Sequence, residues 1–254
     1  MILLDSEPPE YETVFAADLM FFQSAKAALE KARTATKRIV RANMRHFRHM
    51  EKLEAARVRM DDLDHRGDRP KGSYDDFESL AISAESIESE TTEAYGPLFQ
   101  QLALVHILSA IALEAHINIR AESRLEGRFW RAFERLNVDA KWLLLPKVLG
   151  LPGFDPGAEP FQGFDRLISL RNALVHYKPQ REEYHGFDNP DGFAKKLSLS
   201  IEAGEWSLHT AEAMVIELAK QLGGDSPWRF GTDSTHFLET HIKERTKRRP
   251  RQSR

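Results

Sequence analysis

The feature that most constrains the fold is the stretch of residues 11–63, which contains neither Gly nor Pro. Apolar or small residues recur along it every seven positions, and a second set follows four positions after the first. The two sets are Val14, Phe21, Ala28, Ala35, Ala42, Ala56 and Leu63, and Ala25, Ala32, Ile39, Leu53 and Met60. This spacing predicts an amphipathic stripe on one very long helix, or on two helices in line. Because the centre of the stripe is rich in Ala, a neighbouring helix can approach closely.

Charge is strongly segregated along the chain, although the net charge is only −3. Residues 26–59 hold eleven Lys/Arg against three Glu, and residues 61–93 hold eleven Asp/Glu against three Lys/Arg. The tail, residues 243–254, holds seven basic residues and one Glu. One interpretation is a solvated helix, an acidic linker and a basic tail. The other is that the basic regions attract a polyanion such as RNA. The acidic block can also neutralise the basic one within the fold. The candidate RNA-binding residues are Arg38, Arg41, Arg45 and Arg48.

The second half of the chain predicts a helical domain. A helix begins at Gly96-Pro97, since Pro is favoured at the first helical position. It is apolar almost all round, which predicts a central buried helix. Glu114 and Asn118, one turn apart, interrupt its most apolar side.

The elements that follow are set by turn and cap residues. We expect a helix over 126–149 that Pro146 kinks or divides, and a helix that Pro179 ends. We expect a short strand in "KKLSLSIEA" (195–203), and a last helix capped by Ser207 and ended by Gly223-Gly224. The predicted fold class is all-α. The predicted division is a long N-terminal helix with an acidic linker (1–94), a helical domain (95–223) and a C-terminal segment with a basic tail (224–254).

Composition and missing motifs narrow the function classes. There is no Cys, which excludes disulfides and thiolate metal sites and fits a cytoplasmic protein. The acidic start has no basic segment typical of a secretory signal, and we expect no apolar run long enough to span a bilayer. Phosphate-binding loops, dinucleotide fingerprints, zinc-protease motifs and serine-nucleophile motifs are absent. We therefore expect no metal and no cofactor.

The segment "LISLRNALVHYKP" (167–179) is the chief functional candidate. On a helix, Phe164, Leu167, Ile168, Leu174 and Val175 form one apolar stripe, and Arg171 falls in its middle. Asn172 and His176, four residues apart, lie together at the edge. A guanidinium is suited to phosphate oxygens, and an imidazole can move protons near neutral pH. An amide one turn before the imidazole can orient it or bind a phosphate.

The motif "RNALVH" (171–176) resembles the Arg-x(4–6)-His motif of the HEPN superfamily, whose Arg is often followed by a polar residue. The segment "LEAHIN" (113–118) on the preceding apolar helix is also similar to such domains, and the resemblance covers about residues 95–222. It implies a four- or five-helix bundle, here with a long N-terminal helical extension. It also implies a homodimer in which paired motifs face one cleft. Toxin-like members are metal-independent endoribonucleases of toxin–antitoxin and anti-phage defence systems.

Carried over to this chain, the resemblance makes Arg171 the phosphate clamp, His176 the acid/base and Asn172 the orienting residue. Supporting residues are Glu114, Asn118, Tyr177 and Lys178. The ribose 2′-OH would attack the adjacent phosphate, so DNA would not react. The partners implied are an RNA substrate, a second copy of the chain and a separate antitoxin or regulator, with no membrane.

Two alternatives stay open. Arg171 and His176 lie about 140° apart on an ideal helix, so fraying before Pro179 or pairing in a dimer is needed to bring them together. Arg171 can instead form a buried ion pair with Glu114, with Asn118 beside it, which would be a structural role. Some HEPN-like domains are binding modules, so a non-catalytic dimeric interaction module is the second functional hypothesis.

Overall fold

The computed structural model describes residues 11–67, 73–177, 191–224 and 238–242. The predicted all-α fold class is confirmed, because helices make up most of the described chain. The helices in order are α1 (Ala17–Arg66), α2 (Ser73–Glu122), α3 (Gly127–Glu134), α4 (Val138–Val148), α5 (Phe161–Val175), α6 (Asp191–Lys196) and α7 (Ile201–Gln221). One small addition was not predicted: strand β1 (Tyr11–Phe15) pairs antiparallel with β2 (Leu238–Ile242).

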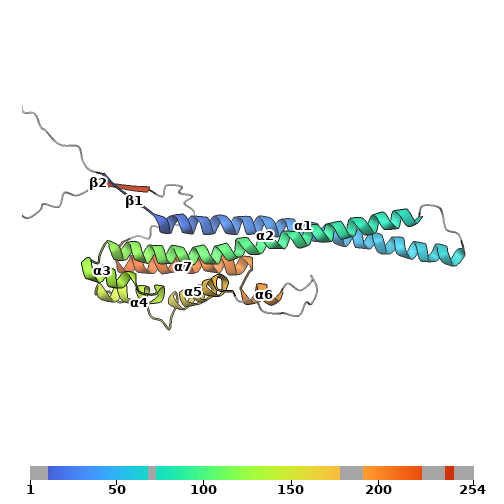
Figure 1. Cartoon of the computed structure of the whole chain (residues 1–254). Coiled ribbons are helices and arrows are strands. Elements are labelled where there is room, and N and C mark those ends of the chain that lie inside the picture. The colour runs from blue at the N-terminus through green and yellow to red at the C-terminus, as the bar shows by residue number, and fades with distance from the viewer. Residues whose placement is uncertain (1–10, 68–72, 178–190, 225–237, 243–254) are drawn as a thin grey trace, which may run out of the picture.

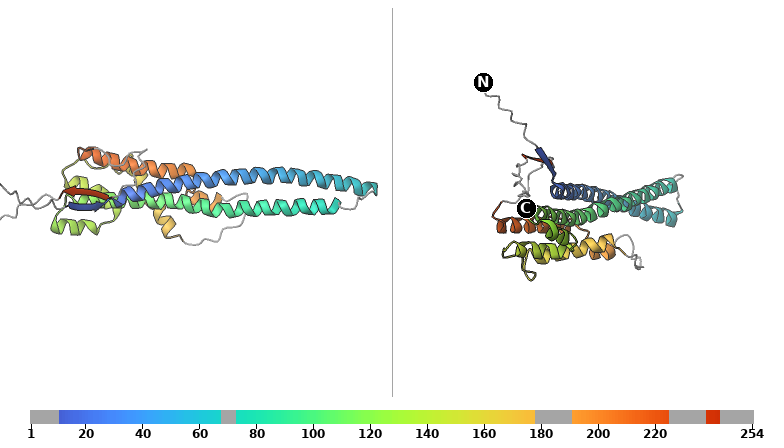
Figure 2. Two further views of the ribbon diagram at one scale, coloured as in Figure 1. Left: turned by 90° about the horizontal axis from the view of Figure 1, so that it is seen from above. Right: turned by 60° about the vertical axis from the view of Figure 1, so that its left-hand side comes forward.

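Two helices of 50 residues each, α1 and α2, form an antiparallel pair that runs the length of the molecule (Figure 1). At 1.5 Å per residue each is roughly 75 Å long. The other helices gather against one end of the pair, and the rest projects beyond them in every view (Figure 2). We call the projecting part, residues 40–66 and 73–94, the arm, and the remainder the body.

The heptad stripe predicted for residues 11–63 is confirmed in the first half of α1, whereas Val14, also assigned to the stripe, lies in strand β1. Ala25, Ala28, Ala32, Ile39 and Ala42 are all buried. Their small side chains allow α2 to lie close along α1. The helix ends where Gly67 takes the left-handed conformation (φ 71°), which closes the last turn.

One ion pair joins the acidic block to the basic stretch across the arm, so the expected neutralisation of the basic block is found only in part among the described residues. Arg45 on α1 donates to both carboxylate oxygens of Glu90 on α2, at 2.9 and 3.0 Å. Both side chains are more than half exposed, so this pair adds little to stability. It shows that Arg45 and Glu90 lie opposite each other on the two helices.

The expected helix start at Gly96-Pro97 is wrong, because α2 runs without interruption from Ser73 to Glu122. Gly96 and Pro97 lie on the exposed side, whereas Ala84, Thr91 and Leu98 are buried on the other side. A proline inside a helix costs about 3 kcal/mol, and continuous packing on α1 offsets that cost. The expected acidic linker is therefore helical, and no helix boundary lies between residues 94 and 95.

Two other regions differ from the predictions, and one helix end agrees with them. The 126–149 region divides at residues 135–137, where Asn137 caps α4 by accepting from Ala140 N–H, and Pro146 lies inside α4. Residues 195–203 form no strand. They carry the end of α6 and the start of α7, which Ser200 caps by accepting from Ala203 N–H. Gly223 (φ 72°) follows the C-cap of α7, as predicted.

One core joins the N-terminal half of α1 to α2, α4, α5 and α7. An aromatic cluster at its centre fixes α5 against α4. The Trp142 ring lies 5.9 Å from that of Phe164 and 5.6 Å from that of Phe154, and the rings of Phe161 and Phe164 are 5.2 Å apart. These contacts hold the helix that carries the Arg171 motif.

Candidate functional site

The helix α5 is buried at its start and exposed at its end. Phe164, Leu167 and Ile168 are in the core, as the stripe predicted. Leu174 is only half-buried, and Val175 is 48% exposed, so the stripe does not extend to these residues. Arg171 is therefore half-buried at the point where α5 leaves the core, rather than in the middle of a buried stripe.

Arg171 and Asn172 are joined directly. The Arg171 Nη1 donates to Asn172 Oδ1 at 2.9 Å. The backbone carbonyl of Asn172 accepts the backbone N–H of His176, also at 2.9 Å. The amide of Asn172 thus contacts the guanidinium, whereas the prediction had it orienting the imidazole or binding a phosphate.

His176 is the residue at which α5 stops. Its φ of −108° and ψ of 29° are those of a C-cap residue outside the regular helix. The 140° separation of an ideal helix therefore does not fix the direction of its side chain. His176 and Asn172 are both exposed and Arg171 is half-exposed, so all three can meet a solvent-borne phosphate.

The expected ion pair between Arg171 and Glu114 is not found in the described residues. The polar partner of Arg171 there is Asn172, and Glu114 on α2 is half-buried without an ion pair. The Oδ1 atom of Asn118 is inaccessible and has no hydrogen-bond partner in the same part of the chain. Within the described residues Arg171 is therefore neither fully buried nor ion-paired.

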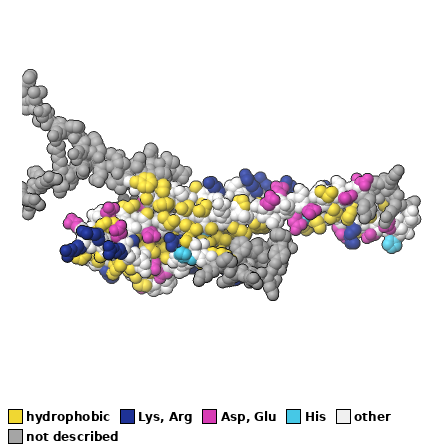
Figure 3. Space-filling view, in the orientation of Figure 1, with side chains coloured by type: hydrophobic (Ala, Val, Ile, Leu, Met, Phe, Trp, Pro, Cys, Tyr) yellow, Lys and Arg dark blue, Asp and Glu magenta, His cyan; other side chains and the backbone are white. Residues whose placement is uncertain are grey.

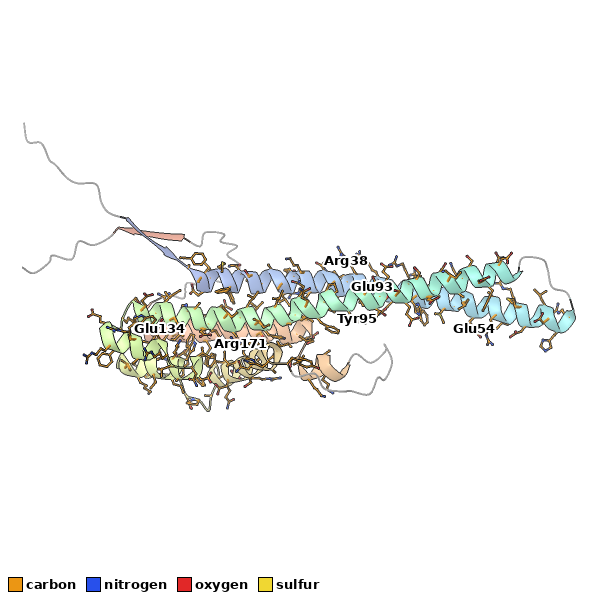
Figure 4. All side chains as sticks on the ribbon, viewed as in Figure 1. Arg38, Glu54, Glu93, Tyr95, Glu134 and Arg171 are labelled. Atoms are coloured by element: carbon orange, nitrogen blue, oxygen red, sulfur yellow. The ribbon has the colours of Figure 1, made fainter. Side chains whose placement is uncertain are left out.

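The remaining candidates do not all join this site. Tyr177 follows His176 and is 49% exposed, while Lys178 and the residue after it lie outside the described residues. Arg38, like Arg41, Arg45 and Arg48, is on α1. Figure 4 shows Arg171 below α2 in the body and Arg38 on the outer side of α1, toward the arm. The basic tail also lies outside the described residues.

A half-exposed apolar strip lies on α2, on the side turned away from its buried face. Leu104, Ile107, Ile111 and Ala115 recur at helical spacing along it, and all are half-buried. Figure 3 shows hydrophobic side chains gathered along this part of the molecule. Leu174, three residues after Arg171, packs against a buried cluster that includes Leu98 and Leu102 of α2. The motif thus lies close to α2, whose apolar strip a monomer leaves partly uncovered.

Two buried histidines were not singled out from the sequence. His116 on α2 donates from Nδ1 to the Asp18 carboxylate on α1 at 2.7 Å, and its ring lies 6.2 Å from that of Trp142. Burial lowers the pKa of His116, and the nearby Asp18 opposes this shift less strongly. In the sequence, the buried position of His116 is indicated only by its place among apolar residues on the helix predicted to be central.

His106, also on α2, bridges two other segments. Its Nε2–H donates to the carbonyl of Ser198 at 3.0 Å, and its Nδ1 lies 2.7 Å from Ser207 Oγ. Burial is the main cause that lowers the pKa of His106, so the ring is neutral and Nδ1 accepts from the Ser207 hydroxyl. Ser207, expected to be a cap, is instead a buried residue inside α7.

Metal and membrane chemistry receive no direct support. Within the described ranges no group of three or more His, Asp or Glu side chains is placed to hold a metal ion. The segment Asp75–Glu122 contains an 18-residue window of mean hydropathy 1.7, of which 50% is buried. By length and composition alone it would suffice to cross a membrane, which qualifies the expectation that no apolar run is long enough. The core helix of a soluble protein meets the same criterion.

Comparison with known proteins identifies no relative. No family model, no curated protein and no solved structure matches the chain.

Proposed function

We propose that this protein is a metal-independent, HEPN-type endoribonuclease that acts as a homodimer in the cytoplasm, in a toxin or anti-phage defence system. The observation that carries the proposal is the placement of Arg171, Asn172 and His176 at the exposed end of α5. The reaction needs a cation that binds the phosphate and a group that transfers a proton. Arg171, whose guanidinium is held by the Asn172 amide, can be the first, and His176, which lies just beyond the last helical residue, can be the second.

In the proposed reaction the ribose 2′-OH attacks the adjacent phosphorus and the 5′-oxygen of the next nucleotide leaves. His176 transfers a proton to or from the reacting oxygens. Arg171 binds the non-bridging oxygens as negative charge builds on the phosphorane. Asn172 acts through Arg171, since its Oδ1 atom fixes the direction of the guanidinium.

A second copy of the chain is part of the proposal. The strip of Leu104, Ile107, Ile111 and Ala115 is apolar yet half-exposed, which favours burial against another subunit. Pairing there would bring two copies of the motif near one interface. An Ile111→Glu substitution is expected to shift the solution mass from twice 29.1 kDa to 29.1 kDa without loss of helical circular dichroism.

The test is RNA cleavage by the full-length protein in EDTA, with labelled single-stranded RNA of mixed sequence. Arg171→Ala and His176→Ala are each expected to lower the cleavage rate by at least about 100-fold. Matched controls are Arg131→Ala and His65→Ala, which remove an exposed arginine and an exposed histidine elsewhere and should keep wild-type rates. Cleavage that persists in both site variants, or that all four variants lose equally, would refute the proposal.

The second candidate function is a non-catalytic interaction module, and the arm is the observation that favours it. A pair of helices projecting from the body offers a long surface on which a partner can bind. RNA that stays intact with the wild-type protein, together with binding of a partner through the arm, would favour this function over the first.

A further inference from the structure

Part of α1 carries positive charge that the fold does not neutralise. Residues 31–50 contain seven Lys/Arg and no Asp or Glu. Farther along α1 two arginines form ion pairs with acids one turn away, Arg57–Glu54 (2.8 Å) and Arg66–Asp62 (2.9 Å). In the basic stretch Arg33 and Arg45 have acidic partners.

The remaining arginines of this stretch have no such partner. Within the described residues no ion pair is formed by Arg38, Arg41 or Arg48, and all three are exposed. Surface arginines alone are ordinary, because charged helix faces are usually solvated. What distinguishes this stretch is the kind of residue that lies among the arginines.

A row of large apolar side chains runs along the same stretch. Val40, Met44 and Phe47 are 48%, 59% and 67% exposed. They are spaced by four and three residues, so they share one side of α1. That side is opposite Ile39 and Ala42, which are buried against the rest of the fold. Single exposed apolar residues need no explanation, but a row in register forms a surface that association would bury.

The surface is also hollowed. A shallow groove of about 490 Å³ is lined by Arg38, Arg41, Met44, Arg45 and Arg48 together with Glu90. A neighbouring groove of about 750 Å³ is lined by Met50, Glu51, Glu54, Ala55 and Val58. From Arg38 to Val58 the two span roughly 30 Å along the helix, the length of about three heptads. Figure 4 labels Arg38 and Glu54, which belong to the two grooves.

We propose that this face of α1 binds an amphipathic helix of a partner protein, with its apolar row on Val40, Met44 and Phe47 and its acidic flank on the unpaired arginines. Such helix-in-groove recognition is read by anchors at i, i+4 and i+7, which is the spacing found here. This inference goes beyond the proposed nuclease and does not depend on it.

The observations favour an acidic helix over RNA. RNA phosphates would neutralise the arginines and a base could stack on Phe47, but Val40 and Met44 offer no ring on which a base stacks. The same side of α1 continues with Glu51 and Glu54, which repel phosphate. An amphipathic helix uses both the charge and the apolar row.

The charge pattern of α1 also favours a partner protein over a second copy of this chain. Two α1 helices laid in parallel would bring unpaired arginines face to face, and an antiparallel pair would set only Glu51 and Glu54 against them, because residues 31–50 contain no acid. The acidic outer face of α2 has a shallow groove lined by Ile82, Glu85, Ser86, Ser89, Glu90 and Glu93. This groove offers one large apolar side chain, Ile82, so a second copy of α2 could not cover the apolar row of Val40, Met44 and Phe47.

The test uses a designed, fluorescein-labelled 21-residue helix with Leu at the a and d positions of its heptads. Its flanking positions are Glu over one half, to face Arg38–Arg48, and Gln over the other half, to face Glu51 and Glu54. A twin with Lys in place of Glu is the matched control. Binding to the full-length protein is measured by fluorescence anisotropy, in parallel with a 20-nucleotide single-stranded RNA.

We expect the Glu peptide to bind at least about tenfold more tightly than its Lys twin, and less tightly as salt rises. The double variants Met44→Ser/Phe47→Ser and Arg41→Ser/Arg48→Ser should each weaken binding by at least about tenfold. Arg59→Ser, an exposed arginine outside the row, should stay within about twofold. All substituted side chains are exposed, so circular dichroism should not change.

Four results would overturn the proposal. The first is that the Glu peptide does not bind at millimolar concentration, and the second is that the Lys twin binds equally well. The third is that the double variants lose binding of the RNA but keep binding of the peptide. The fourth is that the wild-type protein has the mass of a dimer and the Met44→Ser/Phe47→Ser variant has that of a monomer. None of these results bears on cleavage at Arg171 and His176, so the two proposals fail separately.

Discussion

The pair of Asp18 and His116 links the first turn of α1 to the middle of α2, and it allows a quantitative prediction. The side chains are 6% and 1% exposed, and the hydrogen bond between them is 2.7 Å long. Because burial lowers the pKa of His116, the imidazole is neutral and donates to a charged carboxylate. The positive end of the α1 dipole also favours that carboxylate.

Removing the imidazole leaves the carboxylate buried with one donor fewer. A hydrogen bond to a charged group contributes about 1.5–3 kcal/mol. Because the imidazole is neutral, the larger cost of breaking a buried ion pair does not apply. We therefore expect His116→Leu to lower the free energy of unfolding by about 1.5–3 kcal/mol. The double variant Asp18→Ala/His116→Leu should lose at least about 1 kcal/mol less than the sum of the two single variants.

The assay is urea unfolding followed by circular dichroism for wild type, both single variants and the double variant, with His65→Leu as an exposed control. Fluorescence of the tryptophans adds a local probe, since the rings of Trp142 and His116 lie 6.2 Å apart. A loss below about 1 kcal/mol for His116→Leu, or single-variant losses that add within about 0.5 kcal/mol, would refute the reasoning.

Three further predictions concern the same core. Burial lowers the pKa values of His106 and His116, so below about pH 6.5 the unfolded chain binds protons that the folded chain does not. Urea titrations at pH 7.5, 6.5 and 5.5 should therefore show the free energy of unfolding falling as the pH is lowered, by up to about 1.4 kcal/mol per pH unit for each imidazole. A rise in stability as the pH is lowered would contradict this. Ser200→Ala should lower the free energy of unfolding by about 1 kcal/mol, because the helix α7 loses its N-cap. Ser207→Ala should lower it by about 1–3 kcal/mol, because His106 Nδ1 loses its hydrogen-bond donor. An unchanged free energy of unfolding for Ser207→Ala in the same urea assay would contradict the hydrogen bond assigned to His106. Gly204→Val should lower the free energy of unfolding by about 1–3 kcal/mol, because even a Cβ atom at this position would lie 3.0 Å from Leu29 Cδ1. An unchanged melting temperature would show that α1 and α7 do not approach this closely.

The long helices show what periodicity can and cannot predict. The heptad stripe of α1 is a strong local signal, so its buried alanines were predicted correctly. The start of α2 was not, because Gly96-Pro97 is an equally strong local signal for a helix boundary. The contacts that overrule it come from α1, and no local pattern in residues 73–97 contains them.

The same reason explains the errors near α7. Alternation in residues 195–203 resembles a strand, but Leu199 packs on α1 and α2, and Ser200 caps a helix. Ser207 has the residue type of a cap, and only the structure shows that it faces His106. Turn glycines are read more reliably, because the left-handed conformation at Gly223 is a local preference.

In the candidate site, residue types were predictable and their relations were not. Arg171, Asn172 and His176 were identified from type and spacing. That Asn172 bonds to Arg171, and that His176 lies beyond the last helical residue, depends on where α5 leaves the core. The pairing of Asp18 with His116 joins positions far apart in the chain, so it required the structure.

The most direct measurement of the central claim is cleavage of one RNA substrate in two forms, in EDTA. One form is all-ribose, and the other has a single 2′-deoxynucleotide on the 5′ side of the bond that is cut. We predict that the all-ribose form yields a 2′,3′-cyclic phosphate at that bond, and that the substituted form stays intact there. Equal cleavage of both forms would contradict attack by the 2′-OH, and with it the roles assigned to Arg171 and His176.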